Sequence, residues 1–165
     1  DADSLYFYVK TAESMTASTD ALWMLLLVDA DRSTYTGWEG YDYMVMNNTE
    51  IAGSFQLTRW DGSSWITFAN VHVQVNGNQM ELALLREQLG MDQTDPAFFF
   101  KWADNPVELS DISTFFMNGD AAPDRRFKYH FGTTLPDPIP QTPYKDHQVP
   151  GDIQFEDFDY GRVRE

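Results

Sequence analysis

Residues 71–84 read Val-His-Val-Gln-Val-Asn-Gly-Asn-Gln-Met-Glu-Leu-Ala-Leu, and this stretch decides the fold class. Val71, Val73 and Val75 alternate with polar residues, as in a strand that buries one face. The Asn-Gly pair at 76–77 tolerates the positive φ angles of a two-residue hairpin turn. Apolar residues then resume at alternate positions. The stretch therefore predicts an antiparallel β-hairpin.

Short runs of aromatic and β-branched residues recur about every 10 to 15 residues along the rest of the chain, with turn-forming residues between them. Helical periodicity is nearly absent, apart from one turn expected at 86–90 that Gly90 ends. Asp-Gly at 61–62 predicts a second hairpin between Trp60 and Trp65. The sequence therefore predicts an all-β fold, an antiparallel β-sandwich of the jelly-roll-like kind. The expected strands span residues 5–10, 22–28, 41–47, 54–60, 65–69, 71–75, 80–85, 97–102, 114–117 and 126–131.

The strand expected at 22–28 has no polar alternation. Such a strand is covered on both faces, or one of its faces carries a ligand or a neighbouring domain. Alternation along the strand predicts which residues share a face. One face would be Met24, Leu26 and Val28 towards the core, and the other Trp23, Leu25 and Leu27.

Composition changes after Phe131, where prolines become frequent. We expect a structured domain over residues 1–131 and an extended proline-rich linker over residues 132–150. No basic and apolar leader precedes the first expected strand, so we expect the sequence to be a piece of a longer chain.

Charge and composition exclude several classes of function. The 165 residues include 26 acidic and 11 basic side chains, a formal net charge of −15, and no cysteine. Such an acidic excess repels phosphate backbones, so we expect no nucleic-acid partner. The longest apolar run is far shorter than the roughly 20 residues that cross a bilayer, so we expect no membrane span. Without cysteine there is no disulfide framework and no cysteine nucleophile.

An acidic stretch from Asp29 to Asp42 follows an expected strand and is a candidate cation site. Asp29, Asp31 and Asp42 could converge on a hard cation such as calcium, which takes oxygen ligands. The stretch is not an EF-hand, because Thr34 and Gly40 stand where that loop requires glycine and glutamate. In the alternative interpretation, the stretch is a polar turn whose aspartates cap backbone N–H groups.

A second acidic turn covers residues 117–127. Asp120 in this turn could join the same cation. Asp124 could instead form a surface ion pair with Arg125 or Arg126, which would contribute little to stability.

Four tryptophans stand at expected turns and are candidate sugar-binding residues: Trp38, Trp60, Trp65 and Trp102. Aromatic rings stack on the C–H faces of pyranoses, and neighbouring polar side chains bind the hydroxyls. Alternatively, each tryptophan belongs to the core of the sandwich.

Catalytic patterns are scarce. The histidines His72, His130 and His147 are isolated, with no serine or carboxylate arranged as in a triad. Because acidic residues are so numerous, a pair at the spacing of a glycosidase would be weak support for catalysis. We therefore expect that the chain is not an enzyme.

Five stretches occur in an order that resembles the sandwich domains similar to family 9 carbohydrate-binding modules. These stretches are residues 5–12, 23–31, 36–43, 100–105 and 118–127. Such domains occur in large secreted bacterial proteins that degrade polysaccharides, which implies an extracellular or cell-surface location. They usually have more chain before the first strand seen here, so a strand or a catalytic domain is expected upstream.

The resemblance also implies site residues. Characterised family 9 modules hold a terminal sugar between two tryptophans and contain structural calcium. The resemblance implies Trp38 and Trp102 as stacking residues and Asp29, Asp31 and Asp42 as calcium ligands. Trp60, Trp65, Tyr41 and Asn105 are further sugar-binding candidates, and Asp120 is a further candidate ligand.

Residues 149–161, Val-Pro-Gly-Asp-Ile-Gln-Phe-Glu-Asp-Phe-Asp-Tyr-Gly, look like the first strand of a family 6 carbohydrate-binding module. This resemblance implies that residues 151–165 begin a second module, with Glu156 as a cation ligand of it.

The sequence therefore predicts a non-catalytic module that binds a polysaccharide or oligosaccharide, next to catalytic and carbohydrate-binding domains of the same chain. One alternative is a structural domain that packs against a catalytic domain and has no sugar site of its own. Another is that the chain forms part of a glycosidase cleft, which predicts paired carboxylates of which one has a raised pKa.

Overall fold

The structure is a computed structural model, and it describes residues 3–18, 21–51, 53–91 and 95–133. The expected linker and the segment that resembles a family 6 module, including Glu156, lie outside these residues. The elements are β1 (Ser4–Lys10), β2 (Leu25–Asp29), β3 (Tyr43–Asn47), β4 (Phe55–Trp60), β5 (Trp65–Asn76), β6 (Gln79–Leu85), the 3₁₀ turn η1 (Glu87–Leu89), β7 (Phe98–Asp104), α1 (Thr114–Met117), β8 (Asp120–Ala122) and β9 (Tyr129–Phe131).

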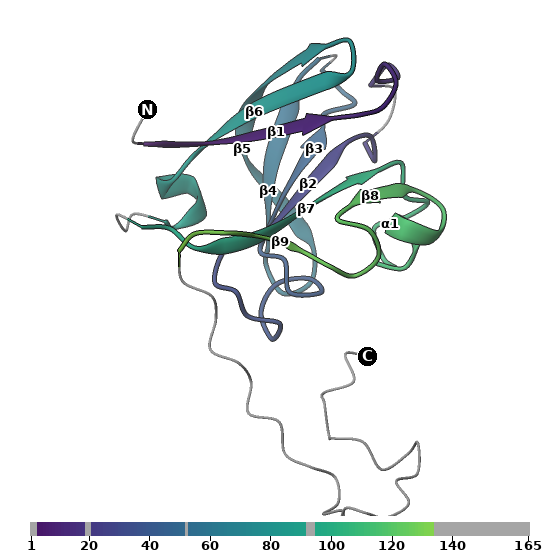
Figure 1. Ribbon diagram of the computed structural model, residues 1–165. Coiled ribbons are helices and arrows are strands. Elements are labelled where there is room, and N and C mark those ends of the chain that lie inside the picture. The colour runs from purple at the N-terminus through teal and green to yellow at the C-terminus, as the bar shows by residue number, and fades with distance from the viewer. Residues whose placement is uncertain (1–2, 19–20, 52, 92–94, 134–165) are drawn as a thin grey trace, which may run out of the picture. The chain divides into compact units, whose positions relative to one another are not determined.

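The strands form an antiparallel sheet in the order β1-β6-β5-β4-β3-β2-β7-β8, and β9 also pairs with β7. The predicted all-β antiparallel fold is confirmed. The sheet curls, so that β1 and β6 at one end of this order lie over the strands that follow β5 in it, in a sandwich-like arrangement (Figure 1). Phe7 of β1 contacts Phe98 and Phe100 of β7 across the core, at ring-centroid distances of 5.8 and 5.5 Å.

Strand β5 links the two halves of the curled sheet. The residues expected as two strands form this one strand, which pairs first with β4 and then with β6. The register shifts between Leu57 and Thr58, where Phe68 is an extra residue on β5. Such a bulge bends a strand, and this lets β5 serve both halves. The predicted hairpin to β6 forms, but its turn residues are Gly77 and Asn78 instead of Asn76 and Gly77, because Asn76 pairs with Gln79. Gly77 has a φ of 62.

Strand β2 is buried on both faces, as its apolar run predicts. Leu26 and Val28 join the main core, whereas Leu25 and Leu27 join a second, smaller apolar cluster. The expectation for Trp23 was wrong. Because Met24 has a φ of 48, alternation breaks there, and Trp23 joins the main core.

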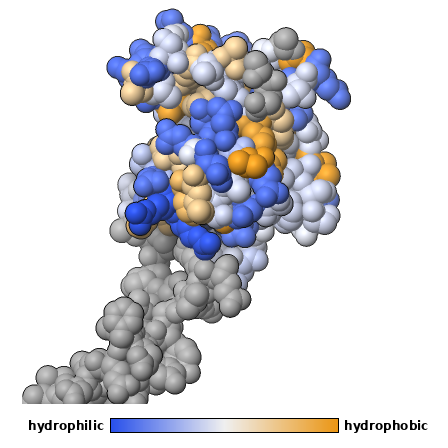
Figure 2. All heavy atoms as spheres, turned by 90° about the vertical axis from the view of Figure 1, so that its right-hand side faces the viewer, coloured by the Kyte–Doolittle hydropathy of each residue, from blue (hydrophilic) through white to orange (hydrophobic). Residues whose placement is uncertain are grey.

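Helix α1 covers the outer face of β2. Residues 114–117 were expected as a strand, but Asp111 accepts a hydrogen bond from the Ser113 backbone N–H and starts a helical turn. Phe115 from this turn packs with Leu25 and Leu27. The α1–β8 side of the molecule is largely hydrophilic, with small separate apolar patches (Figure 2). The outer face of β2, which a neighbouring domain was expected to cover as one alternative, is therefore covered by α1 of the same domain.

The expected strand at 126–131 is shorter in the structure, and β9 begins at Tyr129. The backbone carbonyl groups before β9 accept hydrogen bonds from a side chain instead of pairing with a neighbouring strand. Lys101 of β7, buried on the outer face, donates hydrogen bonds to the carbonyl oxygens of Pro123, Arg125 and Phe127. Strand β8, which was expected as part of a turn, pairs with β7.

The helical turn expected at 86–90 is η1, which Gly90 ends with a φ of 66. Within the ranges that the structure describes, no helix combines the length and the apolar content needed to cross a membrane.

Candidate functional site

The connection from β2 to β3 folds around the side chain of Asp31. Its Oδ1 accepts a hydrogen bond from the backbone N–H of Ser33 at 2.8 Å, and both carboxylate oxygens accept from the Thr36 hydroxyl. Asp42, at the other end of this connection, accepts from the backbone N–H of Ala30 at 2.8 Å. The capping role expected as an alternative for these aspartates is therefore present.

A tight turn at residues 39–40 ends this connection. Trp38 and Tyr41 exchange two backbone hydrogen bonds of 2.8 Å. Between them, Glu39 and Gly40 have φ values of 52 and 76, and two successive positive φ angles are typical of a type I′ hairpin turn. A side chain at Gly40 would approach the Lys128 ammonium, so glycine keeps room for that contact.

Asp29, Asp31 and Asp42 form an acidic cluster at the Asp29 end of β2. One carboxylate oxygen of each lies within 4.8 Å of the others, so the cluster could hold a metal ion. Asp29 is only 1% exposed, and its Oδ2 accepts a hydrogen bond from Lys128 Nζ at 2.7 Å. Asp29 Oδ1 is buried and has no hydrogen-bond partner. A buried carboxylate oxygen without a donor is costly, and a cation would satisfy it.

Burial raises the pKa of both Asp29 and Asp42 above the ordinary 3.8, and neighbouring carboxylates raise it further. The hydrogen bond and charge of Lys128 oppose this shift at Asp29, and the Ala30 N–H opposes it at Asp42. Negative charge thus accumulates in the cluster at a free-energy cost, which a bound cation would offset.

This cost predicts a pH dependence of stability. Between 3.8 and the raised pKa, the native state binds more protons than the unfolded state, so the free energy of unfolding falls as pH rises through that interval. Without divalent ions, Asp42→Asn protein should therefore lose less stability than the unchanged protein as the pH is raised from about 4. Asparagine keeps an oxygen acceptor for Ala30. Urea unfolding at several pH values measures this, and equal losses in both proteins would contradict it.

Three of the predicted tryptophans form one cluster. Trp60 and Trp65 are paired across the β4–β5 hairpin, with ring centroids 5.4 Å apart, and Trp38 lies 6.2 Å from Trp65. The hairpin turn is held by Asp61, whose Oδ1 accepts the backbone N–H groups of Ser63 and Ser64 at 2.8 Å. These hydrogen bonds lower the pKa of Asp61. All three tryptophans are half-buried.

The tryptophan cluster (Trp38, Trp60 and Trp65) adjoins the acidic cluster. The Trp60 backbone N–H donates to the Asp42 carbonyl oxygen at 2.9 Å. A hollow of about 280 Å³ is lined by Asp31, Asp42, Arg59 and Trp60. Two acidic residues, an arginine and a tryptophan therefore lie around one hollow.

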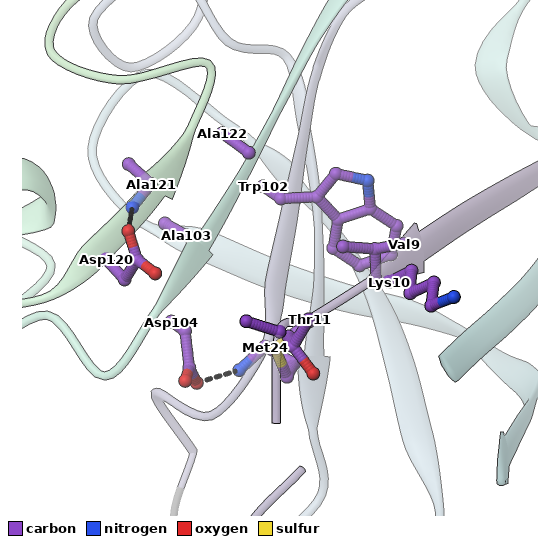
Figure 3. A pocket seen from close by; sticks show the side chains of 11 residues that line it. Val9, Lys10, Thr11, Met24, Trp102, Ala103, Asp104, Asp120, Ala121 and Ala122 are labelled. Atoms are coloured by element: carbon purple, nitrogen blue, oxygen red, sulfur yellow. Dashed lines mark hydrogen bonds between the residues drawn. The ribbon is translucent and has the colours of Figure 1, made fainter. Parts of the chain in front are cut away.

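Trp102, Asn105 and Asp120, which were also predicted as site residues, lie away from the acidic cluster and the tryptophan cluster. Trp102 is 4% exposed and packs in the main core with Phe98, because alternate residues of β7 point inwards. It lines a different hollow with Asp104 and Asp120 (Figure 3), but with 4% of its surface exposed it offers too little ring face for a sugar to stack on. The prediction that Trp102 is a stacking residue is therefore wrong for this structure. Asn105, at the same end of β7, is exposed.

Asp120 does not join the acidic cluster. It pairs with Asp104 on β7, near the Leu25 end of β2, whereas Asp29 is at the other end of β2. At about 3.3 Å per residue, these ends are roughly 13 Å apart. Tyr41 is 2% exposed and lies beneath Lys128, so it supports the acidic cluster instead of facing a sugar.

Two cationic residues at this end were missed by sequence reasoning. Arg59 lines the hollow, and its place opposite Tyr43 could have been inferred from strand alternation. Lys128 is 99 residues from Asp29, and no local pattern marks it as an ion-pair partner.

Comparison with protein-family models, curated proteins and solved structures finds no match to this chain. The fold and the site therefore define its class: an antiparallel all-β domain with an acidic cluster and a tryptophan cluster at one end.

Proposed function

We propose that this chain is a non-catalytic carbohydrate-binding module of a secreted bacterial enzyme that degrades polysaccharides, and that a structural calcium ion occupies its acidic cluster. The observation that carries the proposal is the contact of Trp38, Trp60 and Trp65 beside the hollow that contains Arg59 and Asp42.

The chemistry of this end suits a sugar. Half-buried tryptophans keep part of each ring exposed, and a pyranose presents apolar C–H groups to such rings. Arg59 donates hydrogen bonds, while Asp31 and Asp42 accept them, so the hollow could bind several ring hydroxyls. Rings that already contact each other lose little freedom on binding.

The chemistry of the acidic cluster suits calcium. Calcium takes oxygen ligands in flexible geometry, and three carboxylates supply the charge that it requires. The buried Oδ1 of Asp29 supports this assignment, because it has no hydrogen-bond donor.

A catalytic role is less well supported. Asp29 and Asp42 have raised pKa values, as a general acid requires, but Asp29 is 1% exposed and bound to Lys128. A substrate would not reach its carboxyl group. The module would instead act beside the catalytic and carbohydrate-binding domains of an extracellular or cell-surface protein.

The test is a calorimetric titration with oligosaccharides, chosen from a polysaccharide array. We expect dissociation constants of about 10 μM to 1 mM, since stacking must offset the cost of association. Trp60→Ala should weaken binding at least about fivefold, because one stacked aromatic contributes on the order of 1 to 3 kcal/mol.

The matched control is Tyr6→Ala, which removes an aromatic side chain that is 57% exposed on β1, away from the tryptophan cluster. It should leave binding unchanged. If the array shows no glycan bound by the folded protein, the sugar-binding proposal fails.

One observation favours the alternative, a structural domain that packs against a catalytic domain. Tyr6, Tyr8, Tyr129 and Phe131 are exposed beside a groove between β1 and β7. In that case, Tyr6→Ala would weaken association with the catalytic domain, and Trp60→Ala would not.

A further inference from the structure

Lys128 is a positive charge in direct contact with the acidic cluster. Its Nζ lies 2.7 Å from Asp29 Oδ2 and 2.8 Å from the Gly40 carbonyl oxygen, and 4.1 Å from the centre of the Tyr41 ring. The Lys128 side chain is 10% exposed. The ammonium is therefore held by a carboxylate, a carbonyl and an aromatic face, which are groups that attract any cation.

Asp29 is shared between this ammonium and the rest of the cluster. Its Oδ2 binds Lys128, whereas Oδ1 is buried without a partner. One carboxylate oxygen of Asp29 lies within 4.8 Å of carboxylate oxygens of Asp31 and Asp42. Two positive charges on one buried carboxylate repel each other strongly, because burial leaves little water to screen them. A divalent ion and the Lys128 ammonium therefore compete for Asp29.

We propose that Lys128 is a resident cation of the acidic cluster, and that a divalent ion displaces its ammonium from Asp29 when it binds. This rests on the cation site of the proposed function and adds its regulation. Displacement frees Asp29 Oδ2 and the Gly40 carbonyl oxygen. These two oxygens, added to Asp29 Oδ1, Asp31 and Asp42, bring the cluster closer to the 6 to 8 oxygens that calcium takes.

The displacement has a structural consequence. Lys128 directly precedes β9 and follows the segment that Lys101 holds through its carbonyl oxygens. When Lys128 leaves Asp29, the chain between this segment and β9 loses the hydrogen bonds of the ammonium to Asp29 and to Gly40. Cation binding thus changes the exposure of Lys128.

The first experiment is calorimetric titration of the protein with calcium chloride. Lys128→Gln removes the positive charge but keeps an amide that can donate to Asp29 and Gly40, so this variant should fold. It should bind calcium at least about tenfold more tightly than the unchanged protein. Lys128→Met removes the donor as well, and circular dichroism checks the folding of both. Lys10→Met, at an exposed lysine of β1, should leave calcium binding unchanged.

The second experiment labels lysines with acetic anhydride and locates the label by mass spectrometry. Calcium should increase the labelling of Lys128 several-fold. Lys101 is a buried internal reference that stays unreactive, and Lys10 is an exposed one that stays reactive.

The outcomes separate this inference from the proposed function. If the unchanged protein binds calcium but Lys128→Gln binds it no more tightly, or if calcium does not increase labelling of Lys128, the displacement is wrong and the cation site remains. If neither protein binds calcium, magnesium or manganese, the cation site itself fails, and the displacement with it. Sugar binding is tested independently by Trp60→Ala.

Discussion

Phe115→Ala is expected to lower the free energy of unfolding by about 3 to 5 kcal/mol. Phe115 is 0% exposed, and it packs against Leu25, Leu27 and Met44 from a helix of only four residues. Removing its ring opens a cavity over β2, and so short a helix has no other large buried apolar side chain with which to fill it. Urea unfolding followed by tryptophan fluorescence measures the loss.

Met117→Ala on the same helix is the matched control. Its side chain is 73% exposed, so the free energy of unfolding should change by no more than about 0.5 kcal/mol. A loss below about 1 kcal/mol for Phe115→Ala would contradict the view that α1 seals the outer face of β2.

Lys101→Met is expected to lower the free energy of unfolding by about 2 to 4 kcal/mol. Lys101 is buried beside Leu27 in the β2–β7 register, and its ammonium binds three carbonyl oxygens of the segment before β9. Burial lowers the pKa of Lys101 to about 8, and the charge of Asp124 opposes this shift, so the ammonium remains charged at neutral pH. Methionine fills the same space but leaves these carbonyl groups without their donor.

Lys10→Met is again the control, because it makes the same substitution at an exposed lysine of a strand. Thermal unfolding of both variants gives the comparison. Similar melting temperatures for the two variants would mean that the segment from Pro123 to Phe127 needs no buried ammonium to hold it.

The sequence predicted those parts of the candidate site whose residues are close together in the chain. Asp29, Asp31 and Asp42 flank one connection, and Trp60 and Trp65 flank one hairpin, so short-range turn chemistry brings each set together. Trp102 could not be placed in this way. Its neighbours at 103–105 suggested a turn, but the strand extends to Asp104, and alternation turns the indole inwards.

The expected strand at 114–117 was wrong for a similar reason. Its aromatic residues resemble a short strand, but Asp111 and Thr114 provide local hydrogen bonds that start a helical turn. Burial of Phe115 over β2 then selects the helix, because tertiary packing decides the structure of segments with weak local preferences.

By itself, the sequence determined the all-β antiparallel class, the hairpins that join β4 to β5 and β5 to β6, and the apolar character of both faces of β2. These features depend on alternation, turn residues and apolar runs, which act between residues close in the chain. Only the tertiary structure decided that Lys128 binds Asp29, that Lys101 holds the segment before β9, and that Trp38 joins Trp60 and Trp65. Each of these depends on contacts between distant segments, which form only because burial at one end of the curled sheet makes charged and aromatic groups find partners there.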